Sequence, residues 1–162
     1  MSKIKFQMTA SLALTLLWVL AGASQTSAQK RTCPTFYIAA SGRFVHSEMI
    51  ALRGASNLPP GSILIVNIED YIGEGSKVLN NQLTVVVDHR GFFEANIRPK
   101  KGISFRMNQI CDVVFMADYP KQPVEVIRAV GRHGENLGFP DNPQAYTNSG
   151  GHYLNEKTIV WE

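Results

Sequence analysis

Hydrophobic and polar residues alternate over short runs along most of this chain, and the runs end at Gly, Pro or Asn. In residues 62–69, for example, Leu64, Val66 and Ile68 fall on one side of an extended chain. Such alternation predicts strands that bury one face. The segments expected to be strands are 35–40, 49–53, 62–69, 83–87, 92–97, 103–107, 110–117, 124–130 and 158–161.

Turn-forming residues separate these runs. Residues 57–61 contain two prolines, which fix φ, followed by a glycine, which tolerates positive φ, so a rigid turn is expected there. Residues 88–91 have the composition of a hairpin turn with Gly91 in the left-handed position. About seven to nine short strands with turns roughly every ten residues predict an all-β fold, a β-sandwich. We expect one domain over residues 29–162, with a long polar loop at about 131–157.

Residues 58–68 read Leu-Pro-Pro-Gly-Ser-Ile-Leu-Ile-Val-Asn-Ile. This stretch resembles the Leu-x-Pro-Gly-Thr-x-Tyr-x-Val-x-Val motif of fibronectin type III domains, with Leu64 where that family has its corner tyrosine. Residues 52–138 also resemble the Ig-like β-sandwich domains of uncharacterised exported bacterial proteins, in which a turn like 57–61, a hairpin like 91–93 and a Gln-Pro pair like Gln122-Pro123 recur in order. The resemblance implies a fold and an exported location, and no activity.

The N-terminus has the composition of a secretory signal peptide. Lys3 and Lys5 precede an apolar run over residues 8–23, and small residues follow. Cleavage is expected after Ala28, with Ala23 as the alternative. An uncleaved anchor is the competing interpretation, but the run is shorter than the roughly 20 residues of a spanning helix. We therefore expect a secreted or periplasmic protein without a stable membrane span.

Composition and net charge indicate which classes of binding partner are to be expected. The chain is 44% hydrophobic, which is too apolar for a disordered chain. Without residues 1–28 it keeps 14 of its 16 basic residues against 13 acidic ones. A nearly neutral protein has no electrostatic reason to bind nucleic acid. An envelope protein or a glycan is the expected kind of partner.

Cys33 and Cys111 are the two cysteines of the chain. Export would place them in an oxidising compartment, so a disulfide bond between them is expected. The alternative is two buried free thiols. No Cys-x-x-Cys motif is present and no third ligand is clustered with them, so no metal site and no cofactor are predicted.

Candidate chemistry is sparse. Among the four histidines, His133 and His152 could approach each other across the predicted loop, with Glu135 or Asp141 as a carboxylate. Residues 131–134 could form an anion-binding nest of backbone N–H groups, or simply a glycine-rich hairpin loop. Residues 148–152 contain Ser and His but lack the Gly-x-Ser-x-Gly pattern of serine hydrolases.

Aromatic residues interspersed with amides in the predicted loop suggest a binding surface, because rings supply apolar area and amides supply directional hydrogen bonds. The expected binding residues are Phe139, Tyr146, His152 and Tyr153; alternatively, they pack the loop against the sandwich. We therefore expect an exported non-catalytic module with a binding or structural role, and no enzyme. The competing hypothesis is a secreted hydrolase or metal-dependent enzyme with a site around His133 and His152.

Overall fold

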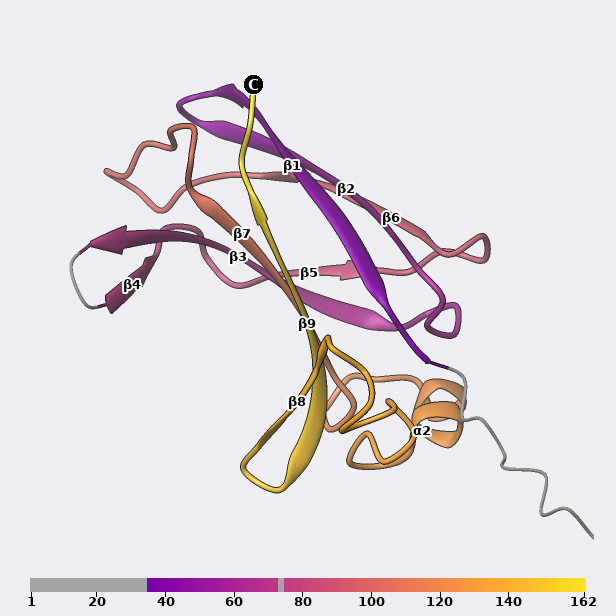
Figure 1. Cartoon of the computed structure of the whole chain (residues 1–162). Coiled ribbons are helices and arrows are strands. Elements are labelled where there is room, and N and C mark those ends of the chain that lie inside the picture. Colours follow the sequence, from indigo (N-terminus) through magenta and orange to yellow (C-terminus); the bar gives the residue numbers. More distant parts are fainter. Residues whose placement is uncertain (1–34, 73–74) are drawn as a thin grey trace, which may run out of the picture. The chain divides into compact units, whose positions relative to one another are not determined.

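The computed structural model describes residues 35–72 and 75–162, which fold into two β-sheets and a short helix (Figure 1). The smaller sheet has the order β1-β2-β6, with β1 (Ile38–His46), β2 (Met49–Ser56) and β6 (Phe92–Ile97). The larger sheet has the order β4-β3-β7-β9-β8, and β5 also pairs with β3. Its strands are β3 (Ile63–Ile72), β4 (Gly75–Val78), β5 (Leu83–Val86), β7 (Ile110–Met116), β8 (Ala145–Asn148) and β9 (Gly151–Ile159).

The two sheets pack face to face as a β-sandwich, which confirms the prediction of an all-β sandwich. Alternate residues of β3 and β7 fill the core in paired rows: Leu64 lies opposite Phe115, and Val66 opposite Val113. All four are fully buried. In β6, the predicted inward residues Phe93 and Ile97 are buried, whereas Phe92 and Glu94 point outward. Period-two alternation therefore placed these strands correctly.

The sandwich is closed along one side by the end of β9. Trp161, just beyond β9, forms a parallel bridge with Arg43 of β1. Its backbone N–H donates to the Gly42 carbonyl at 3.1 Å, and its carbonyl accepts from Phe44 N–H at 2.6 Å. The turn at residues 88–91 connects β5 to β6, and the two strands diverge from it. That turn forms as expected, with Gly91 at φ +84°, but β5 pairs with β3 and β6 with β2, so the two strands join different sheets.

Residues 124–130 are wrongly predicted as a strand, because they form the helix α2 (Val124–Val130). Its two buried residues, Val126 and Val130, are four positions apart and so share a helical face. Glu125 in the first turn and Arg128 in the last turn complement the helix dipole. A run of only seven residues is too short for its apolar positions to distinguish a strand from a helix. Tertiary packing therefore determined that this segment is helical.

Residues 103–107 are also wrongly predicted as a strand. Of the expected inward row, Phe105 is buried, but Ile103 is half-buried and Met107 is exposed. Conversely, β1 continues through Ser41 and Gly42, although the predicted strand ended at residue 40. A Cβ on Gly42 would lie 3.3 Å from Cys111 Cβ, so the glycine lets β1 and β7 approach closely.

The segment 131–157, predicted as a long loop, contains β8 and most of β9. Two amide side chains of this segment bind the start of β1. Asn142 Nδ2 donates to the Phe36 carbonyl at 2.6 Å, and Gln144 bonds both the N–H and the carbonyl of Ile38. The segment is therefore an integral part of the sandwich.

Cys111 carries a free, fully buried thiol, so the predicted disulfide bond is not formed in the structure. Burial, assisted by the neighbouring Asp112 charge, raises the thiol pKa to about 12. The partner cysteine, Cys33, and the predicted signal peptide lie outside the described residues. No helix within the described ranges is long and apolar enough to cross a membrane.

Candidate functional site

The four aromatic residues expected to form a binding surface lie on opposite faces of the β8–β9 hairpin. Tyr146 pairs with Tyr153 across the hairpin, and their ring centroids are 5.5 Å apart. His152 precedes Tyr153 in β9 and therefore points to the other face, where its ring lies 5.0 Å from that of Phe139. The four residues make two separate ring pairs and no common patch.

Tyr153 belongs to the packed structure. It is only 5% exposed, and its hydroxyl donates to Asp118 Oδ2 at 3.2 Å. Burial, with the Asp118 charge and hydrogen bond, raises the pKa of Tyr153 above its ordinary value. Phe139 and Tyr146 are exposed. Of the two tyrosines, Tyr146 is therefore accessible to a ligand, whereas Tyr153 packs the hairpin into the fold.

The structure does bring His133 and His152 together, through their backbones. His152 N–H donates to the His133 carbonyl at 2.7 Å. Glu135 Oε2 accepts from His133 N–H at 3.0 Å, and backbone N–H groups, led by that of Glu135 itself, lower the pKa of this carboxyl. Within residues 131–134, the N–H groups of Gly131 and Gly134 bond the carbonyls of Ile127 and Gly131, so this segment forms the glycine-rich loop rather than an anion-binding nest.

These titratable groups do not make a metal centre. Across residues 35–72 and 75–162, no three His, Cys, Asp or Glu side chains are placed to hold a metal ion. The Glu135 carboxylate is engaged by the loop backbone, where it stabilises the turn.

Two hollows lie on or beside the outer sheet face, which we define as the solvent side of β1-β2-β6. Strand register arranges its side chains in three rows across the sheet. The rows are Ala39–Ala55–Phe92, Ser41–Arg53–Glu94 and Arg43–Ala51–Asn96. Four of the nine positions carry Ala or Ser, so the longer side chains stand above a low floor. In Figure 1 the larger sheet lies on the other side of these strands.

The first hollow, which we call the β1–β2 hollow, has a volume of about 400 Å³. Ser41 and Ala51 form its small-residue floor, and Arg43, Arg53 and Trp161 complete its lining. Arg43 lies directly opposite Ala51, and Arg53 opposite Ser41, so the two arginines occupy diagonal corners of one cross-strand block.

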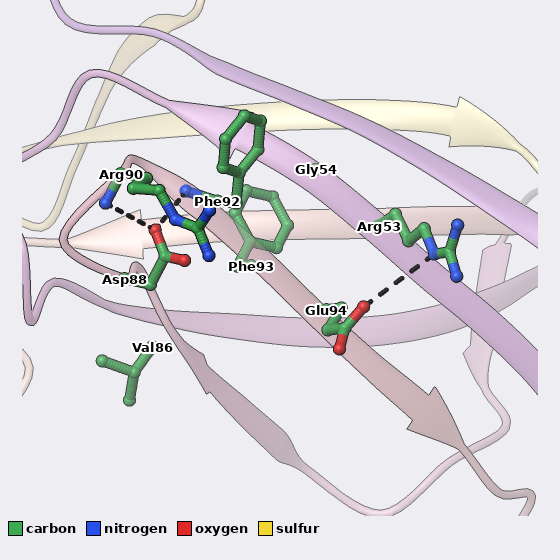
Figure 2. A pocket seen from close by; sticks show the side chains of 8 residues that line it. All are labelled: Arg53, Gly54, Val86, Asp88, Arg90, Phe92, Phe93 and Glu94. Carbon is green, nitrogen blue, oxygen red and sulfur yellow. Dashed lines mark hydrogen bonds and ion pairs between the residues drawn. The ribbon is translucent and has the colours of Figure 1, made fainter.

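The second hollow, the β5–β6 pocket, has a volume of about 590 Å³ and shares Arg53 with the first (Figure 2). It opens where β5 and β6 separate, and it exposes Val86 and Phe92, each more than half accessible to solvent. Its lining residues are Arg53, Gly54, Val86, Asp88, Arg90, Phe92, Phe93 and Glu94. The two hollows together extend across the outer sheet face and around its β6 edge.

The Asp88 carboxylate at this pocket is structural. Its Oδ1 accepts from the backbone N–H groups of Arg90 and Phe92, both at 2.8 Å (Figure 2). These bonds, the Phe92 bond foremost, lower the Asp88 pKa below its ordinary value of 3.8. These hydrogen bonds stabilise the turn that connects β5 in the larger sheet to β6 in the smaller sheet.

The two arginines of the β1–β2 hollow are available to a ligand. Arg53 Nε lies 3.9 Å from Glu94 Oε2, beyond hydrogen-bond distance, and the two side chains are 84% and 79% exposed (Figure 2). Such an exposed pair contributes little stability. Within the described part of the chain, the Arg43 side chain makes no hydrogen bond or ion pair.

Trp161 is an anchored yet exposed ring. Its indole Nε1–H donates to Ser41 Oγ at 3.0 Å, and its backbone is bonded to Gly42 and Phe44. The residue nevertheless remains 54% exposed. An aromatic side chain held in place while presenting its surface loses little conformational entropy when it binds a ligand.

Sequence reasoning did not single out these residues. The signal was present, since Arg43 and Arg53 stand among small residues on the polar side of two neighbouring strands. Only the cross-strand register places them at diagonal positions of paired strands, and only the bridge between Trp161 and Arg43 brings Trp161 beside them. No known family model, curated protein or solved structure matches the chain.

Proposed function

We propose that this protein is an exported, non-catalytic β-sandwich module that binds its ligand on the outer sheet face. The observation that carries the proposal is the pair of adjoining hollows that share Arg53 and expose Arg43, Trp161 and Phe92. Export is supported by Lys3, Lys5 and the apolar run that follows them. The Ig-like resemblance agrees with a binding module of the cell envelope.

The side chains around the hollows support binding more than catalysis. Catalysis needs titratable groups that converge on one reacting atom, with the protonation states that the reaction requires. At the β5–β6 pocket, Asp88 is engaged by the turn backbone, and Glu94 is a solvent-exposed partner of Arg53. Arginines beside exposed rings are instead the residue types that dominate recognition surfaces.

The test is a comparison of binding between face variants of the full-length chain, expressed and recovered after export. Retention of the protein on the envelope fraction of its source organism is measured by sedimentation. We expect the double variant Arg43→Gln/Arg53→Gln to lose most of this retention, because both guanidinium groups leave the outer sheet face.

The matched control is the double variant Arg128→Gln/Arg132→Gln, which removes the same number of positive charges from exposed positions in α2 and just after it. This variant should be retained like the unchanged protein. Equal retention of the double variant and the control would show that the outer sheet face is not the binding surface. A protein that is not retained at all would contradict the envelope partner that the proposal assigns.

A further inference from the structure

The β1–β2 hollow holds two arginines around a floor of two small residues. Arg43 and Arg53 lie at diagonal positions of two paired strands, and Ser41 and Ala51 fill the other two corners. Diagonal neighbours on one face of a sheet are about 7–8 Å apart, which is within reach of two long side chains. Because the other two corners are short, both guanidinium groups can approach the same point above the floor.

The charge of the hollow favours an anion. None of the five residues that line it is acidic, and two of them are arginines. The nearest recorded acidic contact is the exposed Glu94, at 3.9 Å from Arg53 Nε. The planar guanidinium forms paired hydrogen bonds with a carboxylate, which are stronger than bonds between neutral groups.

The remaining two groups fit a ring that carries hydroxyls. Trp161 offers an anchored apolar surface at one side of the hollow. Ser41 Oγ accepts the indole hydrogen, so its own hydroxyl hydrogen remains to be donated to a ligand. A sugar ring has C–H groups that pack on an aromatic surface and hydroxyls that accept such a hydrogen bond.

The backbone next to the hollow argues against an extended peptide. A peptide that adds a strand to a sheet needs free N–H and carbonyl groups along an edge. On the outer edge of β1, those of Ile38 are taken by Gln144, and Trp161 bonds the Gly42 carbonyl and the Phe44 N–H. Recognition on this face therefore depends on side chains.

From these contacts we propose that the β1–β2 hollow binds a uronate residue of an acidic saccharide. The carboxylate lies between Arg43 and Arg53, the sugar ring packs on Trp161, and Ser41 donates to a ring hydroxyl. The assignment rests on the proposed function, which it deepens by naming the ligand class.

Trp161 supplies the readout. The chain has two tryptophans, and Trp18 lies in the predicted signal peptide. In the exported protein, checked by mass to lack Trp18, fluorescence reports on Trp161 alone. We titrate with a short oligogalacturonate, with the same oligomer as its neutral methyl ester, and with oligoglutamate as an acidic peptide.

We expect saturable changes in Trp161 emission with oligogalacturonate, and weaker binding at higher salt. Arg43→Gln and Arg53→Gln should each weaken binding about ten- to hundredfold, the effect of losing a charge-assisted hydrogen bond. Arg128→Gln should bind like the unchanged protein. Thermal melts of each variant establish that it is folded.

Equal binding of the methyl ester would overturn the carboxylate assignment, and equal or tighter binding of oligoglutamate would overturn the saccharide assignment. If no probe binds while envelope retention still depends on Arg43 and Arg53, the ligand class is wrong and the proposed function stands. If no probe binds and the retention is independent of these arginines, both fail.

Discussion

Gly54 of β2 sits beneath the ring of Phe93, and its replacement by Ala tests how tightly the smaller sheet is packed. A Cβ at this position would lie 2.1 Å from Phe93 Cζ and 2.5 Å from the Ala39 carbonyl oxygen. The ring has little room to retreat, because Phe93 is 4% exposed in the core. The Ala39 backbone is held in the β1–β2 ladder opposite Ala55.

The expected cost follows from two opposing effects. Forcing an extra methyl group into a packed core costs about 1–3 kcal/mol, and a backbone carbonyl together with a buried ring places Gly54→Ala near the upper end. Alanine offsets about 0.5–1 kcal/mol of this, because it reduces the backbone entropy of the unfolded chain. The free energy of unfolding should fall by about 2 kcal/mol, which lowers Tm by roughly 6–12 °C for a domain of this size.

The assay is thermal and urea unfolding followed by far-UV circular dichroism. Gly75→Ala in β4 is the matched control, because a Cβ there has nothing within 4 Å and the residue is not left-handed. It should be neutral or slightly stabilising. If Gly54→Ala proves as mild as Gly75→Ala, the packing argument is wrong.

A second variant separates the two contacts at Gly54. Phe93→Leu removes the ring atoms that meet the new methyl group and leaves the Ala39 carbonyl in place. Gly54→Ala/Phe93→Leu should therefore be more stable than the sum of the single changes predicts, by about 1 kcal/mol. Strict additivity would show that the ring does not cause the cost.

Three further predictions concern other side chains. Tyr153→Ala should lower the unfolding free energy by about 3–5 kcal/mol, the cost of truncating a buried aromatic residue, and Tyr146→Ala by under about 1 kcal/mol; similar losses in urea unfolding would contradict this assignment. Cys111 should resist alkylation in the native protein and react on unfolding, because its thiol pKa is about 12; mass spectrometry showing rapid native labelling would argue otherwise. The Asp88 pKa is lowered in the folded state, so its stabilising contribution is present above its unfolded pKa and is lost as pH falls through the folded value; unfolding of Asp88→Asn should be less sensitive to pH in the acid range, and an unchanged acid profile would refute that role.

Much of the sandwich could be predicted from the sequence because alternation is a local property. The rows of Leu64 and Val66 in β3, of Val113 in β7 and of Phe93 in β6 follow directly from a side-chain period of two. The turn at Gly91 likewise follows from local chemistry, since a left-handed residue there needs no distant contact. A strand that buries one face needs apolar residues at every second position, and this requirement is visible in the sequence.

Tertiary structure decided what depends on distant partners. Taken by itself, the short run at Val124–Val130 is compatible with either a strand or a helix. Its packing in the folded protein determines that it is a helix. β8 and β9 have a polar composition, yet their ladders and the amides of Asn142 and Gln144 incorporate them into the sandwich.

The candidate site belongs to the same category. Arg43 and Arg53 line the same hollow because of the β1–β2 register, and Trp161 joins this lining from more than a hundred residues away along the chain. Local patterning determines which face of each strand is polar, because that depends on residues two positions apart. Which polar residues become neighbours depends on strand pairing, and that is fixed only when the whole core is assembled.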